Sequence, residues 1–195
     1  MERQRSDADA RDVELLRKSA AGNGKAFHEL VDRHADRLYR LAVSLVGGAT
    51  DAEDVLQEAF TGAYQGLAGF EGRASVKTWL TRILVTQAAK LRRDRKRHSR
   101  ERSGEASGSP RDDDEARLAP SVALPGGAGL VESRIDVHAA VQRLSAEHRE
   151  VVVLREFEHL SYEEIAQVLD VPRGTVESRL HRAREELRKR FKGYL

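Results

Sequence analysis

The chain has 195 residues, enough for one ordinary domain or two small ones. Charged residues make up 34% and aromatic residues only 5%, which favours an all-α fold over a β-sandwich or barrel. The formal net charge is only +2, but the basic residues are clustered, so local charge matters more than the total. The absence of cysteine excludes a disulfide framework and a thiolate metal site.

The N-terminal sequence MERQRSDADARDVELL has no apolar signal region. No apolar run approaches the roughly 18 residues that a membrane span needs. We therefore expect a cytoplasmic protein that does not insert into a membrane, and we expect no cofactor and no metal.

The first block of the chain, residues 12–97, has apolar residues at helical spacings of three and four. Glycines divide it, and the pattern predicts helices near 12–21, 25–46, 51–66 and 75–96. We expect these helices to form the first of two small domains.

The composition changes after this block, between Ser103 and about Val131, where prolines and glycines surround an acidic patch. Such a stretch has too little apolar surface to offset the entropy of ordering it. We therefore predict a flexible linker over residues 98–132.

Helical periodicity returns in residues 133–195 and predicts four further helices as the second domain. A short helix from about Tyr162 to Leu169, a turn, and a longer helix from about Arg173 have the spacing of a helix-turn-helix. Ser161 and Glu164 predict a capping box, and Pro172 suits the start of the second helix.

The second helix of this motif is expected to pack through Val176, Leu180 and Ala183, which leaves a polar outer face for the major groove. Arginine can recognise guanine there, and glutamate can accept a hydrogen bond from cytosine. That face would contain Arg173, Glu177, Ser178, His181, Arg182 and Arg184. Arg188, Lys189, Arg190 and Lys192 would follow as phosphate contacts. A helical hairpin with a solvated basic face is the alternative, but the coincidence of spacing, cap and turn favours DNA binding.

A second polar feature is the acidic segment near residue 51, where Thr50 and Glu53 suggest a capping box that opens a helix. On local physics alone, a well-capped solvated helix explains its acidic residues.

Next comes the loop with Phe70, followed by Arg73, Lys77, Trp79 and Arg82, and then by the basic run KLRRDRKRHSRER. Aromatic groups beside dense positive charge can hold single-stranded DNA by stacking and phosphate attraction. Trp79 is better explained as a core residue, whereas the basic run favours nucleic acid over a solvated helix end.

Three motifs in order, DAEDVLQEAF at 51–60, KTWLTRI at 77–83 and LSYEEIAQVLDVPRGTVESRLHRAREELR at 160–188, resemble the extracytoplasmic-function (ECF, group IV) RNA polymerase sigma factors of bacteria. The resemblance covers about residues 12–97 and 133–192. It implies a subunit that binds core RNA polymerase and directs promoter-specific initiation, with an anti-sigma factor as a further partner.

By this resemblance, residues 12–97 are a sigma region 2 domain and residues 133–195 a sigma region 4 domain. The residues implied to bind core polymerase are Asp51, Glu53, Asp54, Gln57 and Glu58. Those implied near the melted minus-ten strand are Phe70, Arg73, Lys77, Trp79 and Arg82. Those implied at the minus-thirty-five duplex are Arg173, Thr175, Glu177, Ser178, Arg179, His181 and Arg182.

Two positions depart from the family pattern. Thr86 and Lys90 stand where an asparagine and an aspartate are common, which leaves the minus-ten preference open. Asp170 stands where the turn often has glycine, but aspartate tolerates left-handed backbone angles better than most residues.

Two rival functions are a helix-turn-helix regulator that acts without polymerase and a sigma mimic that sequesters an anti-sigma factor. The acidic helix and the basic aromatic block argue against the first, and the basic recognition helix argues against the second. An enzyme is not expected, because His28 and Glu29 lack the second histidine of a zinc-protease motif, and Asp32 stands at that position.

Overall fold

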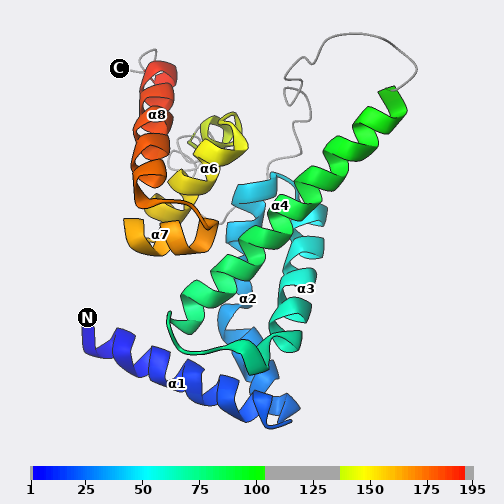
Figure 1. The fold of residues 1–195 in the computed structure, drawn as a ribbon, viewed down its shortest axis with the longest axis vertical. Helices are drawn as coiled ribbons and strands as arrows, with labels where there is room; N and C mark the ends of the chain where they lie inside the picture. The colour runs from blue at the N-terminus through cyan, green and yellow to red at the C-terminus, as the bar shows by residue number, and fades with distance from the viewer. Residues whose placement is uncertain (1, 104–136, 192–195) are drawn as a thin grey trace, which may run out of the picture.

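The computed structural model describes residues 2–103 and 137–191, and no strand occurs in them. Their helices confirm the predicted all-α fold, shown in Figure 1. The first group is formed by α1 (Glu2–Ala20), α2 (Gly24–Val46), α3 (Ala49–Gln65), η1 (Leu67–Gly69) and α4 (Val76–Ser103). None of the helices in the described ranges is both long enough and apolar enough to cross a membrane.

Helix α2 lies at the centre of this group and packs against α1, α3 and α4. Its N-cap Asn23 accepts hydrogen bonds from the backbone N–H of Lys25 and Ala26. It ends at Gly47, whose φ of 82° is a left-handed conformation that glycine adopts without strain. Its buried face includes Leu38 and Leu45, both fully shielded from solvent.

Helix α3 begins one residue before the predicted cap. The N-cap is Gly48, which has no side chain to cap with, and Thr50 lies inside the helix. The predicted capping box of Thr50 and Glu53 is therefore wrong. Asp51 does lie in the first turn, where a carboxylate is favoured by the helix dipole.

Helix α4 is longer than the pattern predicted, since it continues to Ser103 rather than ending near residue 96. Arginine and lysine are good helix formers, and Arg97 pairs with Glu101 one turn on. The helix thus extends past the expected linker start at residue 98. The rest of the predicted tether, residues 104–132, lies outside the described residues.

The second group starts with helical residues 137–142 and continues through α6 (Ala146–Val152), the π-helix η2 (Val153–Phe157), α7 (Tyr162–Leu169) and α8 (Arg173–Phe191). Ile165 of α7 is fully buried with Val176, Leu180 and Ala183 of α8, as the sequence predicted. This packing fixes the angle between the two helices of the motif.

The turn chemistry of this motif is also as predicted. Ser161 and Glu164 form the capping box, with each side chain bonded to the other residue's backbone N–H. Asp170 adopts the left-handed conformation, with φ 54° and ψ 50°. Helix α8 then begins at Arg173, directly after Pro172.

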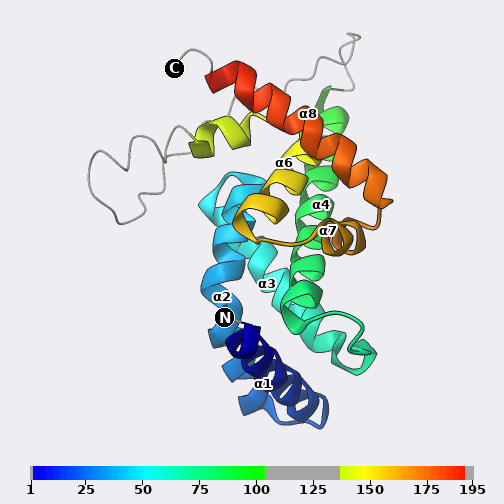
Figure 2. The same cartoon turned by 90° about the vertical axis from the view of Figure 1, so that its left-hand side faces the viewer.

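The two groups are in contact. Helix α7 lies beside α4 in both Figure 1 and Figure 2, and α6 and η2 touch α2. The sequence pattern did not predict this contact.

Candidate functional site

The outer face of α8 carries most of the residues expected to bind duplex DNA. Five of them have exposed side chains: Arg173, Glu177, Ser178, His181 and Arg182. Thr175 and Arg179 are only partly exposed. Arg179 pairs with Glu147 at 2.9 Å, so it braces α8 against the start of α6.

Arg173, at the start of α8, is held by two carboxylates. Its Nε donates to Glu177 at 2.9 Å and its Nη1 donates to Glu163 at 2.5 Å. The hydrogen bond to Glu177, with the charge of Glu163, raises the pKa of Arg173 above its ordinary value. To bind a base or a phosphate, this guanidinium would first have to release at least one of these two carboxylates.

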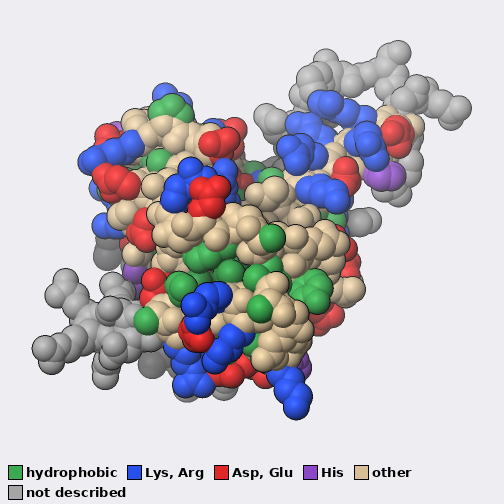
Figure 3. Space-filling view, turned by 60° about the horizontal axis from the view of Figure 1, so that its bottom comes forward, with side chains coloured by type: hydrophobic (Ala, Val, Ile, Leu, Met, Phe, Trp, Pro, Cys, Tyr) green, Lys and Arg blue, Asp and Glu red, His purple; other side chains and the backbone are tan. Residues whose placement is uncertain are grey.

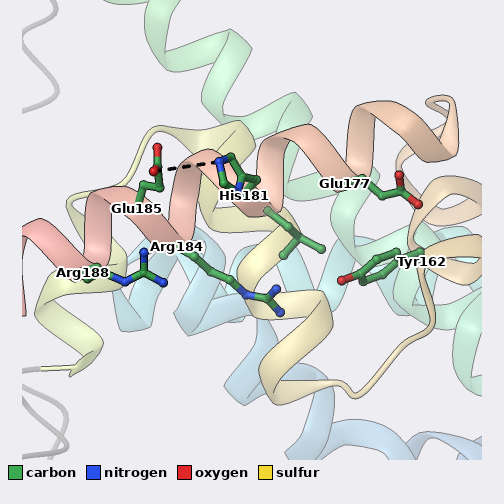
Figure 4. A pocket seen from close by; sticks show the side chains of 7 residues that line it. Tyr162, Glu177, His181, Arg184, Glu185 and Arg188 are labelled. Atoms are coloured by element: carbon green, nitrogen blue, oxygen red, sulfur yellow. Dashed lines mark ion pairs between the residues drawn. The ribbon is translucent and has the colours of Figure 1, made fainter.

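A shallow hollow runs along α8 beside Tyr162 of α7, and Figure 4 shows its lining. His181 and Glu185 lie on the α8 ridge, with His181 Nε2 3.9 Å from a Glu185 oxygen. Arg184 projects into the hollow and donates to Glu156 at 2.9 Å. The face is therefore mixed in charge rather than uniformly basic, which suits selective base contacts.

The acidic residues of α3 form an exposed ridge. Glu53, Asp54, Gln57 and Glu58 are all exposed, at spacings that keep them on one side of the helix. Asp51 is the exception, because its side chain is 18% exposed and bonded to Arg95 of α4. Four of the five expected polymerase contacts are therefore available on one surface.

Phe70 and Trp79 meet beside the loop after α3. Their rings pack edge to face with centroids 5.4 Å apart, and both side chains are partly buried against the core. Trp79 is thus neither a full core residue nor a free stacking platform. Stacking a base on either ring would need an open ring face, because an exposed edge alone does not stack.

Basic residues follow each member of this aromatic pair in the chain. Arg73 is exposed and pairs with Glu71, and Arg82 is exposed on α4. Thr86, one turn after Arg82, donates its hydroxyl to the Arg82 carbonyl at 2.8 Å, and Lys90 is exposed beyond it.

Further along α4, blue side chains gather at the upper right of Figure 3. The exposed basic residues of this end are Arg93, Arg95, Lys96, Arg97 and Arg100. Such a cluster attracts phosphates, and the attraction falls with salt.

Lys77 differs from these residues, because the second group of helices binds it. Its ammonium donates to the backbone oxygen of Glu158 at 2.8 Å and lies 3.4 Å from the Glu158 carboxylate. The same carboxylate accepts from Arg37 of α2 at 2.6 Å. Arg37 and Glu158 are 121 positions apart, and no sequence motif marked either of them.

Among the described residues, no group of histidine, aspartate and glutamate is arranged to hold a metal ion.

Comparison with known proteins identifies both groups of helices. The family Sigma-70 region 2 matches residues 30–98, and the family Sigma-70, region 4 matches residues 134–187. The RNA polymerase sigma-H factor of Pseudomonas aeruginosa is 36% identical over 91% of this chain and 92% of its own length. The ECF RNA polymerase sigma factor SigW of Bacillus subtilis is 32% identical over 91% of this chain and 95% of its own.

Solved structures agree with these matches. The sigma factor RpoE of Bartonella quintana, in complex with the anti-sigma factor NepR, is 28% identical with a TM-score of 0.69, over 86% of this chain and 98% of its own. CnrH in complex with the cytosolic domain of CnrY is 27% identical with a TM-score of 0.67, over 94% of this chain and 98% of its own. With region 2 and region 4 in the expected order on an all-α fold, the chain belongs to the extracytoplasmic-function family of RNA polymerase sigma factors.

Proposed function

We propose that the chain is a group IV sigma factor that binds core polymerase through α3, the melted minus-ten strand through the Phe70 region and α4, and the minus-thirty-five duplex through α8. The observation that carries this proposal is the exposed outer face of α8 in a region 4 fold. We further propose that it acts in the cytoplasm and has no catalytic activity of its own.

The polymerase contact rests on the acidic ridge of α3. Glu53, Asp54 and Glu58 present three carboxylates, with Gln57 between them, on one exposed surface. A basic helical segment of the polymerase is the partner that such a ridge fits, because opposite charges speed association and fix the orientation. The salt bridge from Arg95 holds Asp51 at the edge of the ridge, so we assign it a smaller share of the contact.

The minus-ten contact combines stacking with phosphate attraction. Phe70 and Trp79 supply aromatic surface, while Arg73 in the loop before α4 and Lys77 and Arg82 on α4 supply positive charge. A base that leaves the duplex could stack on these rings, with its phosphate held by the cations.

The minus-thirty-five contact places α8 in the major groove. Arg182 and His181 would approach base edges in mid-helix, and Arg173 and Thr175 would lie near the phosphates at its start. Glu177 and Ser178 add a hydrogen-bond acceptor and a hydroxyl that can contact base edges. Arg179 holds α8 against the start of α6 through its ion pair with Glu147.

An anti-sigma factor is a further proposed partner. RpoE of Bartonella quintana, which shares this fold, is bound to one in its crystal. The acidic ridge of α3 and the outer face of α8 are both exposed here and are the surfaces that such a partner would compete for.

The test is transcription in vitro from a promoter library with core polymerase, with and without the full chain. We expect start-site-specific transcripts only with the chain, and Asp54→Lys should weaken core binding by about tenfold, since it reverses a charge at the interface. Asp36→Lys, at an exposed acid on α2, is the matched control. Equal binding of both variants would remove α3 from the interface, and the absence of any specific transcript would overturn the proposed function.

A further inference from the structure

Helix α1 lies across the end of the molecule where the chain turns from α3 into α4, as Figure 1 shows. It touches η1, which ends just before the loop with Phe70, and α4, which begins just after that loop. Residues 70–75, between η1 and α4, form neither helix nor strand. Both ends of this loop therefore pack against the same helix.

Helix α1 is itself anchored to α2. The carboxylate of Asp12 accepts from Arg33 Nε at 2.7 Å, and its other oxygen lies 2.8 Å from His34 Nε2. One turn later, Leu15 and Leu16 are buried in the core. This anchor also fixes the side chains three or four positions away on the same face of α1.

Asp9 lies three residues before Asp12 and reaches the start of α4. Its Oδ1 accepts from the backbone N–H of Val76 at 3.3 Å. Val76 is the first residue of α4, and the N–H groups of a first turn have no partner within their own helix. A carboxylate at this position is also favoured by the helix dipole. Asp9 therefore caps α4 from another helix, 67 positions away in the chain.

The Val76 N–H depends on this carboxylate, because Val76 is fully buried. A buried N–H without a partner costs free energy, so removal of the carboxylate should move the start of α4 toward solvent. Ser75 caps the same helix from within the segment, since its Oγ accepts from the Thr78 N–H at 3.1 Å. Without Asp9 the helix should therefore still form, but with its first turn displaced.

A displaced first turn would move the aromatic pair beside the loop. Trp79 belongs to this turn, and its N–H donates to the Ser75 carbonyl at 2.9 Å. Phe70, at the other end of the loop, meets the Trp79 ring at 64°. In an edge-to-face pair, the edge of one ring covers part of a face of the other. The position of the loop thus decides which ring face is left for a base.

We propose that Asp9 is a positioning residue for the minus-ten strand, because its bond to the Val76 N–H sets the arrangement of the Phe70–Trp79 pair. This inference rests on the proposed minus-ten role of those two rings. Asp9 lies outside residues 30–98, which match the region 2 family, and before all three sequence motifs. Helix α1 would then take part in promoter recognition without touching DNA.

The first test uses the full chain, whose single tryptophan is Trp79. Asp9→Ala should shift the fluorescence emission to longer wavelength, because the ring gains contact with water when the first turn moves. Asp9→Asn keeps an acceptor oxygen, and asparagine caps helices about as well as aspartate, so its spectrum should match the wild type. Glu14→Ala is the matched control, because this carboxylate pairs with Arg17 and Lys18 of the same helix.

The second test uses the holoenzyme with core polymerase and a non-template minus-ten oligonucleotide from a promoter that it transcribes. Abasic nucleotides are placed in this strand one at a time. At the position of the unstacked base, the abasic nucleotide should weaken binding to the wild type on the order of tenfold, the size of one base–aromatic stack. The loss should be much smaller with Asp9→Ala and should return with Asp9→Asn. Such coupling between the two changes would not arise from a general loss of stability.

Unchanged Trp79 emission in folded Asp9→Ala would overturn the proposal. A shifted emission with the same abasic loss as in the wild type would also overturn it, since the contact would then serve stability alone. If no abasic position weakens binding to the wild-type holoenzyme, the minus-ten role of the two rings has failed and the positioning of a base fails with it, whereas the emission shift still shows that Asp9 holds the loop. Should Asp9→Ala fail to fold, Asp9→Glu keeps the charge but moves the oxygens by one methylene, and the same outcomes decide.

Discussion

Asp12 of α1 is buried, at 5% exposed, and faces two basic side chains of α2. Arg33 Nε donates to its carboxylate at 2.7 Å, and His34 Nε2 lies 2.8 Å from its other oxygen. Burial by itself would raise the pKa of Asp12, but the hydrogen bonds to His34 and Arg33 outweigh it and leave that pKa below its ordinary 3.8. The pair thus anchors α1 to the domain as an ionised carboxylate.

Asp12→Asn should therefore lower the free energy of unfolding at pH 7 by about 2 kcal/mol, the usual value for hydrogen bonds to a charged group. A carboxylate whose pKa is lower in the folded state stabilises the fold at pH values above its pKa in the unfolded state. That stabilisation is lost as the pH falls through its pKa in the folded state. The difference from the wild type should thus shrink below about pH 3.8.

Denaturant titrations of both proteins at pH 7 and near pH 3 measure this difference. Asp32→Asn, at an exposed carboxylate paired with His28 on the same helix, should cost less than about 0.5 kcal/mol. A difference for Asp12→Asn that is the same at both pH values would contradict the ionised pair.

At Arg182, in the middle of the α8 outer face, the side chain is exposed. Arg182→Ala should weaken binding to the minus-thirty-five duplex by about 1 to 3 kcal/mol if the guanidinium makes a bidentate base contact. Fluorescence anisotropy on cognate and scrambled duplexes separates the two kinds of contact. Equal losses on both sequences would make Arg182 a phosphate contact. Arg17→Ala, at an exposed arginine of α1, is the control.

At the scale of the element, helix α7 depends on its capping box. Ser161 Oγ accepts from the Glu164 backbone, and Glu164 accepts from the Ser161 backbone at 2.8 Å. Ser161→Ala should lower the free energy of unfolding by about 1 kcal/mol, the common cost of a lost N-cap, and should weaken duplex binding because α7 positions α8. Thermal denaturation measures the first effect. Ser99→Ala, on the exposed end of α4, should leave stability unchanged, and an equal loss in both variants would remove the cap as the cause.

The helix-turn-helix could be predicted from the sequence with its bounds, because α7 and α8 are defined by local signals. Ser161, Glu164 and Pro172 mark their starts, and the apolar spacing marks their buried faces. The start of α3 could be predicted less accurately, because its N-cap Gly48 has no side chain that would mark the position in the sequence. The end of α4 was placed too early, since its charged residues carry helix propensity without an apolar face.

The candidate sites also differ in how much of each could be predicted from the sequence. The polar faces of α3 and α8 follow from helical spacing, and most of their residues are exposed, with Asp51, Thr175 and Arg179 only partly so. The roles of the α3 residues came from the family resemblance alone and stay predictions. The bonding of Lys77 to Glu158 depends on how the domains pack, and their contacts join residues far apart in the chain. Helical periodicity contains no information on such pairs.

At the scale of the whole molecule, the contact between the two groups of helices includes two patches along α2, besides the packing of α7 on α4. Arg37 and the carbonyls of Val43 and Ser44 are six to seven residues apart, about 10 Å along the helix at 1.5 Å per residue. Perturbations at that separation, with no shared partner, usually add. The two patches should thus contribute independently to the contact between the two groups.

Gln142→Ala removes the side chain that donates to both carbonyls, and each lost hydrogen bond is worth about 1 kcal/mol. We therefore expect the ratio of separated to docked helix groups, measured by energy transfer between dyes on the two groups, to rise about fivefold for each kcal/mol lost. In combination with Glu158→Gln, the two free-energy changes should add to within about 0.5 kcal/mol. Gln65→Ala, at the exposed end of α3, is the control for an amide outside the contact. No change with Gln142→Ala would show that its two hydrogen bonds do not hold the two groups together. A combined effect far from the sum would mean that the two patches separate as one cooperative unit.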